Sequence, residues 1–158
     1  MNFNILCRKA NIGDLDRILE IESKGFTEEA FSRRQLRYLI QHAKGAVFVA
    51  VLQDVTVGYI SLLTRSNICG RLYSLAVDPA HRGKGIAATL IDAAVDFARE
   101  RGIGSIFLEV DVDNLAAIAL YEKKGFIKRA VKKAYYHSGT DAYSMVRALG
   151  LEARNGSS

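Results

Sequence analysis

The stretch Val77-Asp78-Pro79-Ala80-His81-Arg82-Gly83-Lys84-Gly85-Ile86-Ala87 decides how this chain folds. Before it, residues 72–77 are apolar enough for a β-strand, and after it apolar residues recur at helical spacing over 84–101. The two glycines allow the loop to bend and to approach a ligand, and the start of a helix offers backbone N–H groups that lack intrahelical partners. Because Arg82 and Lys84 add full positive charges, the stretch predicts an anion-binding loop.

Four interpretations of this loop compete. Read as Gly83-x-Gly85-x-x-Ala88, it matches the alanine variant of the dinucleotide fingerprint, but that motif follows its strand directly, and here residues 78–82 intervene. A Walker-type phosphate loop needs Ser or Thr after Gly-Lys, where this chain has Gly85. The plainest alternative is a basic turn before an ordinary helix. Read as Arg82-x-x-Gly85-x-Ala87, the loop resembles the pyrophosphate-binding motif of the GNAT superfamily of N-acetyltransferases, which hold acetyl-coenzyme A.

The size and composition of the chain indicate one globular domain. Its 158 residues are 49% apolar and 25% charged, values typical of a globular protein with a proper core. We expect a single domain over residues 1–150 and a flexible, polar tail over 151–158. The net charge of +5 suits an anionic ligand, but the positive residues are scattered and form no stripe interleaved with aromatics, so we expect no nucleic-acid partner.

Cysteine usage and hydropathy bear on the compartment. Cys7 and Cys69 form no CxxC pair and have no histidine or carboxylate at ligand spacing, so we expect no metal site and a reducing environment. The first residues lack the pattern of a signal peptide, and no apolar run approaches 18 residues. The sequence therefore predicts a cytoplasmic protein without a membrane partner, and none of its features predicts the oligomeric state.

Periodicity predicts an alternation of strands and helices. In chain order we expect a strand at 4–9, a helix from Asn11 or Gly13 to Gly25, a helix from Ser32 to before Gly45, a hairpin of strands 46–52 and 55–63, a strand at 71–77, a helix at 84–101, a strand at 105–110, a helix from Asn114 to Lys124, and strands at 127–136 and 142–148 around a turn at 137–140.

This order indicates an α+β fold with a mostly antiparallel sheet and one parallel strand pair. The GNAT fold has this arrangement, and the resemblance covers residues 4–148. It implies a splayed sheet of about seven strands flanked by about four helices, with acetyl-coenzyme A in the gap between two strands. The residues that it implies for cofactor binding are Leu75, Ala76 and Val77 for the pantetheine arm, and Arg82, Gly83, Lys84, Gly85, Ile86 and Ala87 for the pyrophosphate.

The second half of the chain indicates which members of the GNAT superfamily this sequence resembles most. Residues 108–126 closely resemble ribosomal-protein alanine N-acetyltransferases and protein N-terminal acetyltransferases, in which a Glu, an Asn and a Tyr occur where this chain has Glu109, Asn114 and Tyr121. The run Tyr135-Tyr136-His137-Ser138-Gly139-Thr140-Asp141-Ala142 resembles their final hairpin. The resemblance implies a catalytic base at Glu109, a proton donor at Tyr121, and a cofactor contact at Asn114, which can also serve simply as a helix N-cap.

Acetyl transfer to an amine requires chemistry that these residues can supply. The amine must lose a proton before it attacks, and an α-amine with a pKa of about 8 loses it more readily than a lysine at about 10.4. An ordinary Glu with a pKa of about 4.3 is a weak base, so we expect burial to raise the pKa of Glu109. By the resemblance, the Val77 N–H stabilises the developing oxyanion, and the Tyr121 phenol protonates the departing thiolate. Without the resemblance, Glu109 would be an edge residue and Tyr121 a core residue.

The acceptor is indicated less clearly. By the resemblance it binds between the segment joining the first two helices and the final hairpin, where Glu22, Phe26 and Tyr136 are candidate contacts, although such carboxylates can also be ordinary helix residues. The leading prediction is an N-acetyltransferase that acts on a protein or peptide N-terminal α-amine. The alternatives are a small-molecule amine acetyltransferase, acting on a polyamine, an amino sugar or an amino acid, and a non-catalytic module that binds acyl-coenzyme A.

Overall fold

The structure is a computed structural model that describes residues 4–25, 30–66 and 68–150. The described strands are β1 (Ile5–Lys9), β2 (Gly45–Leu52), β3 (Val55–Arg65), β4 (Cys69–Val77), β5 (Ser105–Asp111), β6 (Ile127–Lys132) and β7 (Ala142–Ala148). The described helices are α1 (Leu15–Gly25), α2 (Arg33–Gln41), α3 (Ile86–Glu100) and α4 (Leu115–Lys123), with 3-10 helices at Ile12–Asp14 and Pro79–His81.

The strands form one seven-stranded sheet in the order β1-β2-β3-β4-β5-β7-β6. The pair β4–β5 is parallel, whereas β1–β2, β2–β3, β5–β7 and β6–β7 are antiparallel. The predicted α+β fold, with a mostly antiparallel sheet of seven strands and four helices, is therefore confirmed for the described residues.

The chain divides into two compact units, and each is described by itself. The first unit is Met1–Leu63 with Leu72–Asp96, and the second is Thr64–Arg71 with Phe97–Ser158. Strand β4 begins in the second unit and continues in the first, and α3 begins in the first unit and ends in the second. The β4–β5 register joins Cys69, Gly70 and Arg71 to Ser105, Ile106 and Phe107, so all three residue pairs belong to the second unit.

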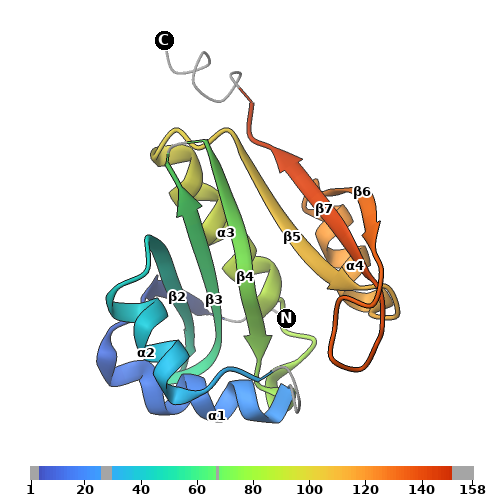
Figure 1. The fold of residues 1–158 in the computed structure, drawn as a ribbon. Coiled ribbons are helices and arrows are strands. Elements are labelled where there is room, and N and C mark those ends of the chain that lie inside the picture. Colours follow the sequence, from blue (N-terminus) through green and yellow to red (C-terminus); the bar gives the residue numbers. More distant parts are fainter. Residues whose placement is uncertain (1–3, 26–29, 67, 151–158) are drawn as a thin grey trace. The chain divides into compact units, whose positions relative to one another are not determined.

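In the first unit, α1 and α2 pack on the strands β2, β3 and β4 (Figure 1). Helix α2 begins at Ser32, whose hydroxyl accepts from the Gln35 N–H at 3.2 Å while the Gln35 side chain accepts from the Ser32 N–H at 2.8 Å. This capping box satisfies two N–H groups at the helix start. The apolar faces of both helices meet the sheet in one buried cluster, which drives the folding of this unit: Leu15, Ile18, Ile21, Leu36, Leu39, Val47, Val49, Tyr59 and Ala76.

Two local features position β3 and its neighbours. Gln53 and Asp54 have φ values of 51° and 66°, the left-handed conformation that closes a two-residue hairpin between β2 and β3, so the predicted hairpin is confirmed. A Cβ on Gly58 would lie 3.1 Å from Ile86 and 3.2 Å from Leu90, both on α3. Glycine at this position therefore allows α3 to pack closely against β3.

In the second unit, the two faces of β5 differ. Ile106, Leu108 and Val110 are buried, whereas the alternate residues Phe107 and Glu109 are partly exposed. This alternation is the pattern of a strand with one face on the core. Glu109 therefore lies on the face of β5 opposite to the buried apolar residues.

Several predicted ends differ from the structure: β3 ends two residues later and β4 begins two residues earlier than predicted, and two further ends are wrong for a clear physical reason. The helix predicted from residue 84 begins at Ile86, because Gly83 and Gly85 adopt φ values of 80° and 77° that no right-handed helix allows. The strand predicted to reach residue 136 ends at Lys132, because Ala134 adopts a φ of 48°. The turn between β6 and β7 is therefore longer than predicted.

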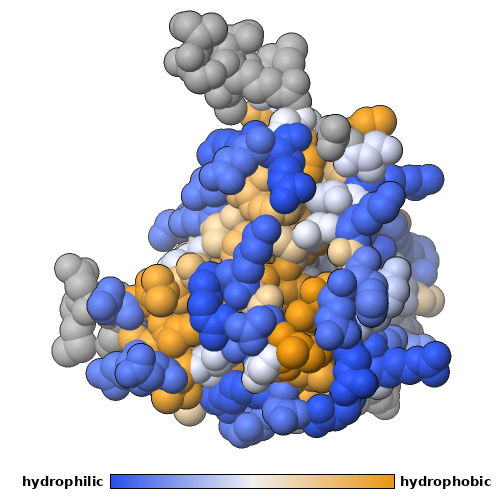
Figure 2. All heavy atoms as spheres, turned by 90° about the vertical axis from the view of Figure 1, so that its left-hand side faces the viewer, coloured by the Kyte–Doolittle hydropathy of each residue, from blue (hydrophilic) through white to orange (hydrophobic). Residues whose placement is uncertain are grey.

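Hydrophilic side chains surround smaller hydrophobic patches on the face shown in Figure 2. Among the large exposed apolar side chains are Ile68, Leu115 and Ile127, which come from different segments of the described chain. None of the described helices has both the length and the apolar character needed to cross a membrane.

Candidate active site

The loop after β4 is held at its start by a buried aspartate. The Asp78 N–H donates to the Val57 carbonyl at 2.8 Å, and the Asp78 carboxylate accepts from the Ala80 N–H at 3.0 Å. Pro79 follows as the first residue of the short 3-10 helix. The Ala80 hydrogen bond, followed by the Arg17 hydrogen bond, holds the pKa of Asp78 below its usual range. The carboxylate therefore fixes the point at which the chain leaves β4.

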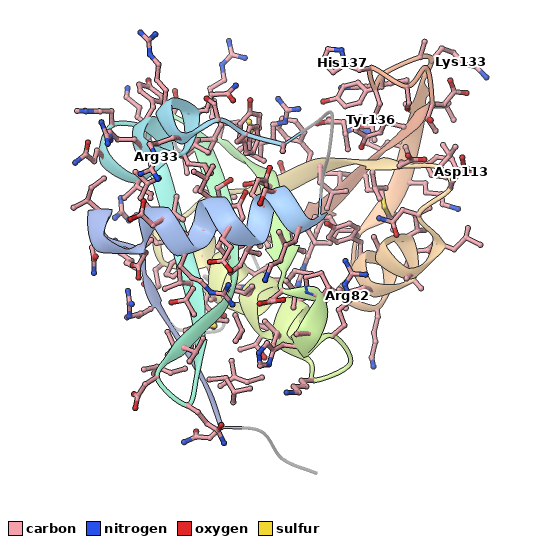
Figure 3. All side chains as sticks on the ribbon, turned by 90° about the horizontal axis from the view of Figure 1, so that it is seen from below. Arg33, Arg82, Asp113, Lys133, Tyr136 and His137 are labelled. Atoms are coloured by element: carbon pink, nitrogen blue, oxygen red, sulfur yellow. The ribbon has the colours of Figure 1, made fainter. Side chains whose placement is uncertain are left out.

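The rest of the loop meets the requirements of an anion site. Gly83 and Gly85 both have positive φ, and a Cβ built on either would point into open space, so the backbone there is uncovered by the described residues. Arg82 extends beside the start of α3 (Figure 3). Lys84 Nζ lies 3.1 Å from Nδ1 of His81. The 15-residue helix α3 has no acidic residue in its first turn, so the positive end of its dipole is not offset there.

The backbone N–H and C=O groups of successive residues along β4 point to opposite edges of the strand, so the residues predicted to bind the pantetheine arm differ in the direction of these groups. Because the Asp78 N–H faces β3, the peptide groups of Val77 and Leu75 point to the opposite edge of the strand, and those of Ala76 point toward β3. A Cβ on Gly58 would lie 3.0 Å from the Ala76 carbonyl oxygen, which agrees with that direction. Leu75 and Val77 therefore present hydrogen-bonding groups away from β3, whereas Ala76 does not.

Arg17 connects α1 to this loop. Its Nη2 lies 2.5 Å from Oδ2 of Asp78, and its Nε donates to the Thr56 carbonyl at 2.8 Å. Lys24 Nζ lies 3.7 Å from the same Asp78 oxygen. The sequence analysis missed Arg17 and Asp78, because a polar residue on an amphipathic helix and an aspartate before a proline carry no signal that they meet.

Glu109 lies in the second unit between two cations. Its side chain is 4% exposed; Oε1 accepts from Arg71 Nη2 at 2.5 Å, and Oε2 accepts from Lys132 Nζ at 3.1 Å. The Tyr135 hydroxyl lies 2.8 Å from the same Arg71 nitrogen and 3.4 Å from Oε1. We expected Glu109 to be buried, and its side chain is, although the residue as a whole is partly exposed; the immediate surroundings of the side chain are charged rather than apolar. Arg71, Lys132 and Tyr135 are site residues that the sequence analysis missed.

Glu109 also lines a cavity of about 500 Å³ in the second unit. Strands β5, β6 and β7 line it, and two of the lining side chains from β6 are cationic. A ligand that enters this cavity can reach the surroundings of Glu109. The lining residues are Ser105, Phe107, Glu109, Arg129, Ala130, Lys132, Ser144 and Val146.

Two further tyrosines belong to the second unit, Tyr136 near Glu109 and Tyr121 near Tyr136. Tyr121 on α4 is half-buried, packs edge-on against Phe126 with ring centroids 5.9 Å apart, and has its pKa raised to about 12 by burial. Tyr136 lies in the turn between β6 and β7 with its ring against Tyr135 at 4.9 Å (Figure 3). Burial, followed by the negative charge of Tyr135, Asp111, Glu109 and Tyr121 when ionised, raises the pKa of Tyr136. Both phenols therefore keep their protons at neutral pH.

Asn114 is the N-cap of α4, which confirms one of the two roles expected for it. Its Oδ1 accepts from the Ala117 N–H at 3.2 Å, and the residue is exposed. The side chain thus satisfies one of the N–H groups at the helix start while part of it faces solvent. Its second expected role, the cofactor contact, stays a prediction.

The residues predicted to contact the acceptor have different surroundings. Glu22 is 1% exposed and accepts from the Tyr59 hydroxyl at 2.7 Å and from the Phe31 N–H at 3.0 Å. Burial raises the pKa of Glu22. Phe26 lies outside the described residues, whereas Phe31 stacks on Tyr73 with ring centroids 5.2 Å apart. The contact of Glu22 with an acceptor stays a prediction, and its observed partners lie in the core.

The described residues contain no group of three or more His, Cys, Asp or Glu side chains placed to hold a metal ion. The groups described above instead provide, in the first unit, a loop whose uncovered backbone and cations suit an anion and, in the second unit, a carboxylate and three phenols.

Comparison with known proteins gives these residues a context. Residues 15–126 match the model of the Acetyltransferase (GNAT) family. An N-alpha-acetyltransferase of Saccharolobus solfataricus is 37% identical over 157 residues, which cover 90% of this chain and 92% of the relative. The structure of Ard1 from Thermoplasma volcanium has a TM-score of 0.87 and 28% identity, and covers 92% of this chain and 98% of that chain.

A second solved structure shows a related protein with ligands. The NatC complex bound to Gag peptide and CoA matches with a TM-score of 0.81 and 26% identity, and covers 95% of this chain and all of the matched one. The glycines, the cations and the start of α3 fit the pyrophosphate of such a cofactor. The chain belongs to the GNAT family of acetyltransferases, enzymes that transfer the acetyl group of acetyl-coenzyme A.

Proposed function

We propose that this protein transfers an acetyl group from acetyl-coenzyme A to the α-amine of a protein or peptide N-terminus. The observation that carries the proposal is the pair of side chains that such a reaction needs in the second unit: Glu109 beside a cavity, and the protonated phenol of Tyr121. The names of the relatives, an N-alpha-acetyltransferase and a complex bound to a peptide, support the same acceptor class.

The first unit would hold the cofactor. Arg82 and Lys84, the backbone N–H groups from Gly83 to Ala87 and the dipole of α3 would neutralise the pyrophosphate. The outward peptide groups of Leu75 and the outward carbonyl of Val77 would pair with the amides of the pantetheine arm. When bound, the cofactor supplies an acetyl group activated as a thioester. The Val77 N–H would donate to the carbonyl oxygen as it gains negative charge.

Glu109 would accept the proton that the amine loses. Its carboxylate is 4% exposed and already accepts from Arg71 and Lys132, so we propose that a water in the adjoining cavity carries the proton to it. Carboxylate oxygens accept more than one hydrogen bond each, which leaves capacity for that water. The N–C bond forms as the C–S bond breaks, and the proton released by nitrogen ends on sulfur after passing through Glu109 and solvent.

Tyr121 would stabilise the leaving sulfur. With a pKa of about 12, the phenol is a weaker acid than a thiol at about 8.5, so complete transfer of its proton to the thiolate is uphill. A hydrogen bond donated by Tyr121 still lowers the energy of the developing thiolate, and solvent completes the protonation. The phenol is therefore proposed as a hydrogen-bond donor in the transition state.

The proposal treats residues 1–150 as one catalytic domain, because it assigns cofactor residues to the first unit and Glu109 and Tyr121 to the second. We also propose a cytoplasmic location. The two described cysteines, Cys7 and Cys69, form no disulfide, which fits a reducing compartment.

A panel of acceptors tests the proposed function. The purified protein is incubated with acetyl-coenzyme A and an N-terminal peptide, an N-terminally blocked lysine peptide, spermidine, glucosamine or free alanine, and thiol release is measured. We expect the N-terminal peptide to accelerate thiol release most, and Glu109→Gln to abolish that acceleration. Faster turnover of a small amine would favour the small-molecule alternative, and tight cofactor binding without any turnover would favour the non-catalytic one.

A further inference from the structure

Glu109 is surrounded by more positive than negative charge. Arg71 on β4, which pairs with β5, lies 2.5 Å from the carboxylate, and Lys132 on β6, which is separated from β5 by β7, lies 3.1 Å from it. Together with Glu109 they leave one positive charge in excess. The Glu109 side chain is only 4% exposed, whereas those of Arg71 and Lys132 are 33% and 47% exposed, so water screens the two cations in part and the carboxylate little. A ligand group beside Glu109 therefore meets net positive charge.

The other charged groups near Glu109 leave the excess positive: Asp111, two residues on along the same face of β5, adds one negative charge and accepts from the Asp113 N–H at 2.8 Å, and Arg129, which lines the same cavity, adds one positive charge. Tyr135, from the turn after β6, is a neutral phenol whose pKa is raised chiefly by burial. Tyr136 also keeps its proton. Asp141, the acid at the end of the same turn, accepts from Lys133 at 3.2 Å and from the Ala134 N–H at 2.8 Å. The acid of this turn is thus engaged by its own hairpin.

A positive site discriminates between the two protonation states of an amine. A nearby like charge disfavours the ammonium form and leaves the neutral amine unaffected. At pH 7.5 an α-amine with a pKa of about 8 is neutral roughly 200 times more often than a lysine with a pKa of about 10.4. A site that admits only the neutral amine therefore keeps this full difference, whereas an acidic site would bind both ammonium ions.

We propose that Arg71 and Lys132 are specificity-determining residues, which make the site take its acceptor as the neutral amine and thereby favour N-terminal α-amines over lysine side chains. This inference rests on the proposed function, since it places the acceptor amine beside Glu109. Positive charge at the site lowers the pKa of the bound amine, so an amine that arrives protonated gives up its first proton to solvent. Glu109 then takes, through water, the proton that nitrogen loses as the N–C bond forms.

The test compares variants that remove one positive charge each. Arg71→Gln and Lys132→Gln remove charges that contact Glu109, whereas Arg71→Lys keeps the charge at the same position. Lys133→Gln is the matched control, because Lys133 belongs to the same hairpin, is 83% exposed and pairs with Asp141. For each variant, kcat is measured from pH 6 to 9.5 with an α-amine peptide. The ratio of kcat/KM for that peptide to kcat/KM for a blocked lysine peptide is measured at pH 7.5.

We expect kcat to rise with pH about half to one pH unit later in Lys132→Gln and Arg71→Gln, because removing a positive charge raises the pKa of the bound amine. The shift is read from kcat because kcat reports groups in the bound complex. The α-to-lysine ratio should fall about fivefold or more, and Lys133→Gln and Arg71→Lys should leave both quantities close to those of the unmodified protein. Peptides with different N-terminal residues show which group causes the rise of kcat with pH. If the amine causes it, the pH of the rise follows the pKa of each peptide's α-amine. If Glu109 causes it, the pH of the rise stays the same for all peptides.

The outcomes separate this inference from the proposed function. If the unmodified protein transfers acetyl to the α-amine but both Gln variants leave the pH of the rise in kcat and the ratio unmoved, this inference is wrong and the proposed function stands. If the unmodified protein transfers no acetyl to any α-amine peptide, the proposed function fails and this inference with it. Should Arg71→Gln not fold, as judged by thermal unfolding, Lys132→Gln decides, since the Lys132 side chain is 47% exposed.

Discussion

Nη2 of Arg17 lies 2.5 Å from Oδ2 of Asp78, and this ion pair joins α1 to the first residue of the loop between β4 and α3. The Asp78 side chain is 6% exposed and that of Arg17 is 25% exposed, so the pair lies largely out of water. Asp78 also accepts from Ala80 within the loop. The orientation of α1 and the start of the loop therefore depend on the same carboxylate.

Arg17→Met should destabilise the protein and weaken its binding of acetyl-coenzyme A. A buried carboxylate that loses its main partner costs about 2–3 kcal/mol of unfolding free energy, and a loosened loop start should reduce cofactor affinity several-fold. Denaturant unfolding and calorimetric titration measure the two effects. Asp16→Asn, which removes the exposed pair of α1 with Arg33, is the control and should cost less than about 0.5 kcal/mol. Equal effects of the two changes would contradict the role of the pair.

Gly85→Val should weaken acetyl-coenzyme A binding by about tenfold or more. The φ of 77° is strained for any residue with a Cβ, and the added side chain would extend into the space that we assign to the pyrophosphate. Gly139→Val imposes a similar strain at a φ of 86° in the turn between β6 and β7, where a Cβ also meets nothing within 4 Å. Titration of each variant with acetyl-coenzyme A should show weakened binding only for Gly85→Val, and a common loss would refute the assignment of the loop.

Tyr121→Phe should lower kcat by about tenfold to a hundredfold with little change in cofactor affinity. The change removes only the hydroxyl, whose hydrogen bond is needed as the sulfur leaves, and it keeps the ring that packs against Phe126. Single-turnover kinetics with saturating cofactor measure the chemical step directly. An unchanged rate would remove Tyr121 from the mechanism.

Glu22→Gln should stabilise the protein at neutral pH. Burial raises the pKa of Glu22 in the folded state, so the stability that its protonated form contributes is complete below the unfolded value of about 4.3 and is lost as the pH rises through the folded value. A glutamine stays neutral throughout. The advantage of Glu22→Gln in unfolding free energy should therefore grow between pH 4 and pH 7.5.

Urea unfolding at both pH values tests this expectation. Glu20→Gln is the control on the same helix, because the Glu20 side chain is 54% exposed, and its effect should differ much less between the two pH values. A difference between Glu22→Gln and the unmodified protein that stays constant with pH would show that burial of the Glu22 charge has no cost.

Local sequence patterns predicted most of the fold because they report directly on periodicity and caps. Asn114 was identified as an N-cap and Gln53-Asp54 as a hairpin turn, and both are confirmed. The end of β6 was missed, because the alternating residues continue past Lys132 while the hydrogen bond from the Ala134 N–H to Asp141 bends the chain there. A side-chain acceptor seven residues away has no signature in the strand itself.

The sequence predicted individual residues of the candidate site but not the partners that they contact. The strand position of Glu109 follows from alternation, but its partner Arg71 lies 38 residues earlier, and Arg17 and Asp78 are 61 residues apart. A pattern tells which face of an element a side chain occupies, whereas the identity of its partner depends on how distant elements pair. The charged surroundings of Glu109 therefore needed the structure.

The most direct test of the central claim is to locate the transferred acetyl group. A peptide with one α-amine and one internal lysine is incubated with the protein and acetyl-coenzyme A at pH 7.5, and fragmentation mass spectrometry identifies the acetylated nitrogen. We predict acetylation at the α-amine with little at the lysine, and no product with Glu109→Gln. Acetylation confined to the lysine, or equal product formation by Glu109→Gln, would contradict the account.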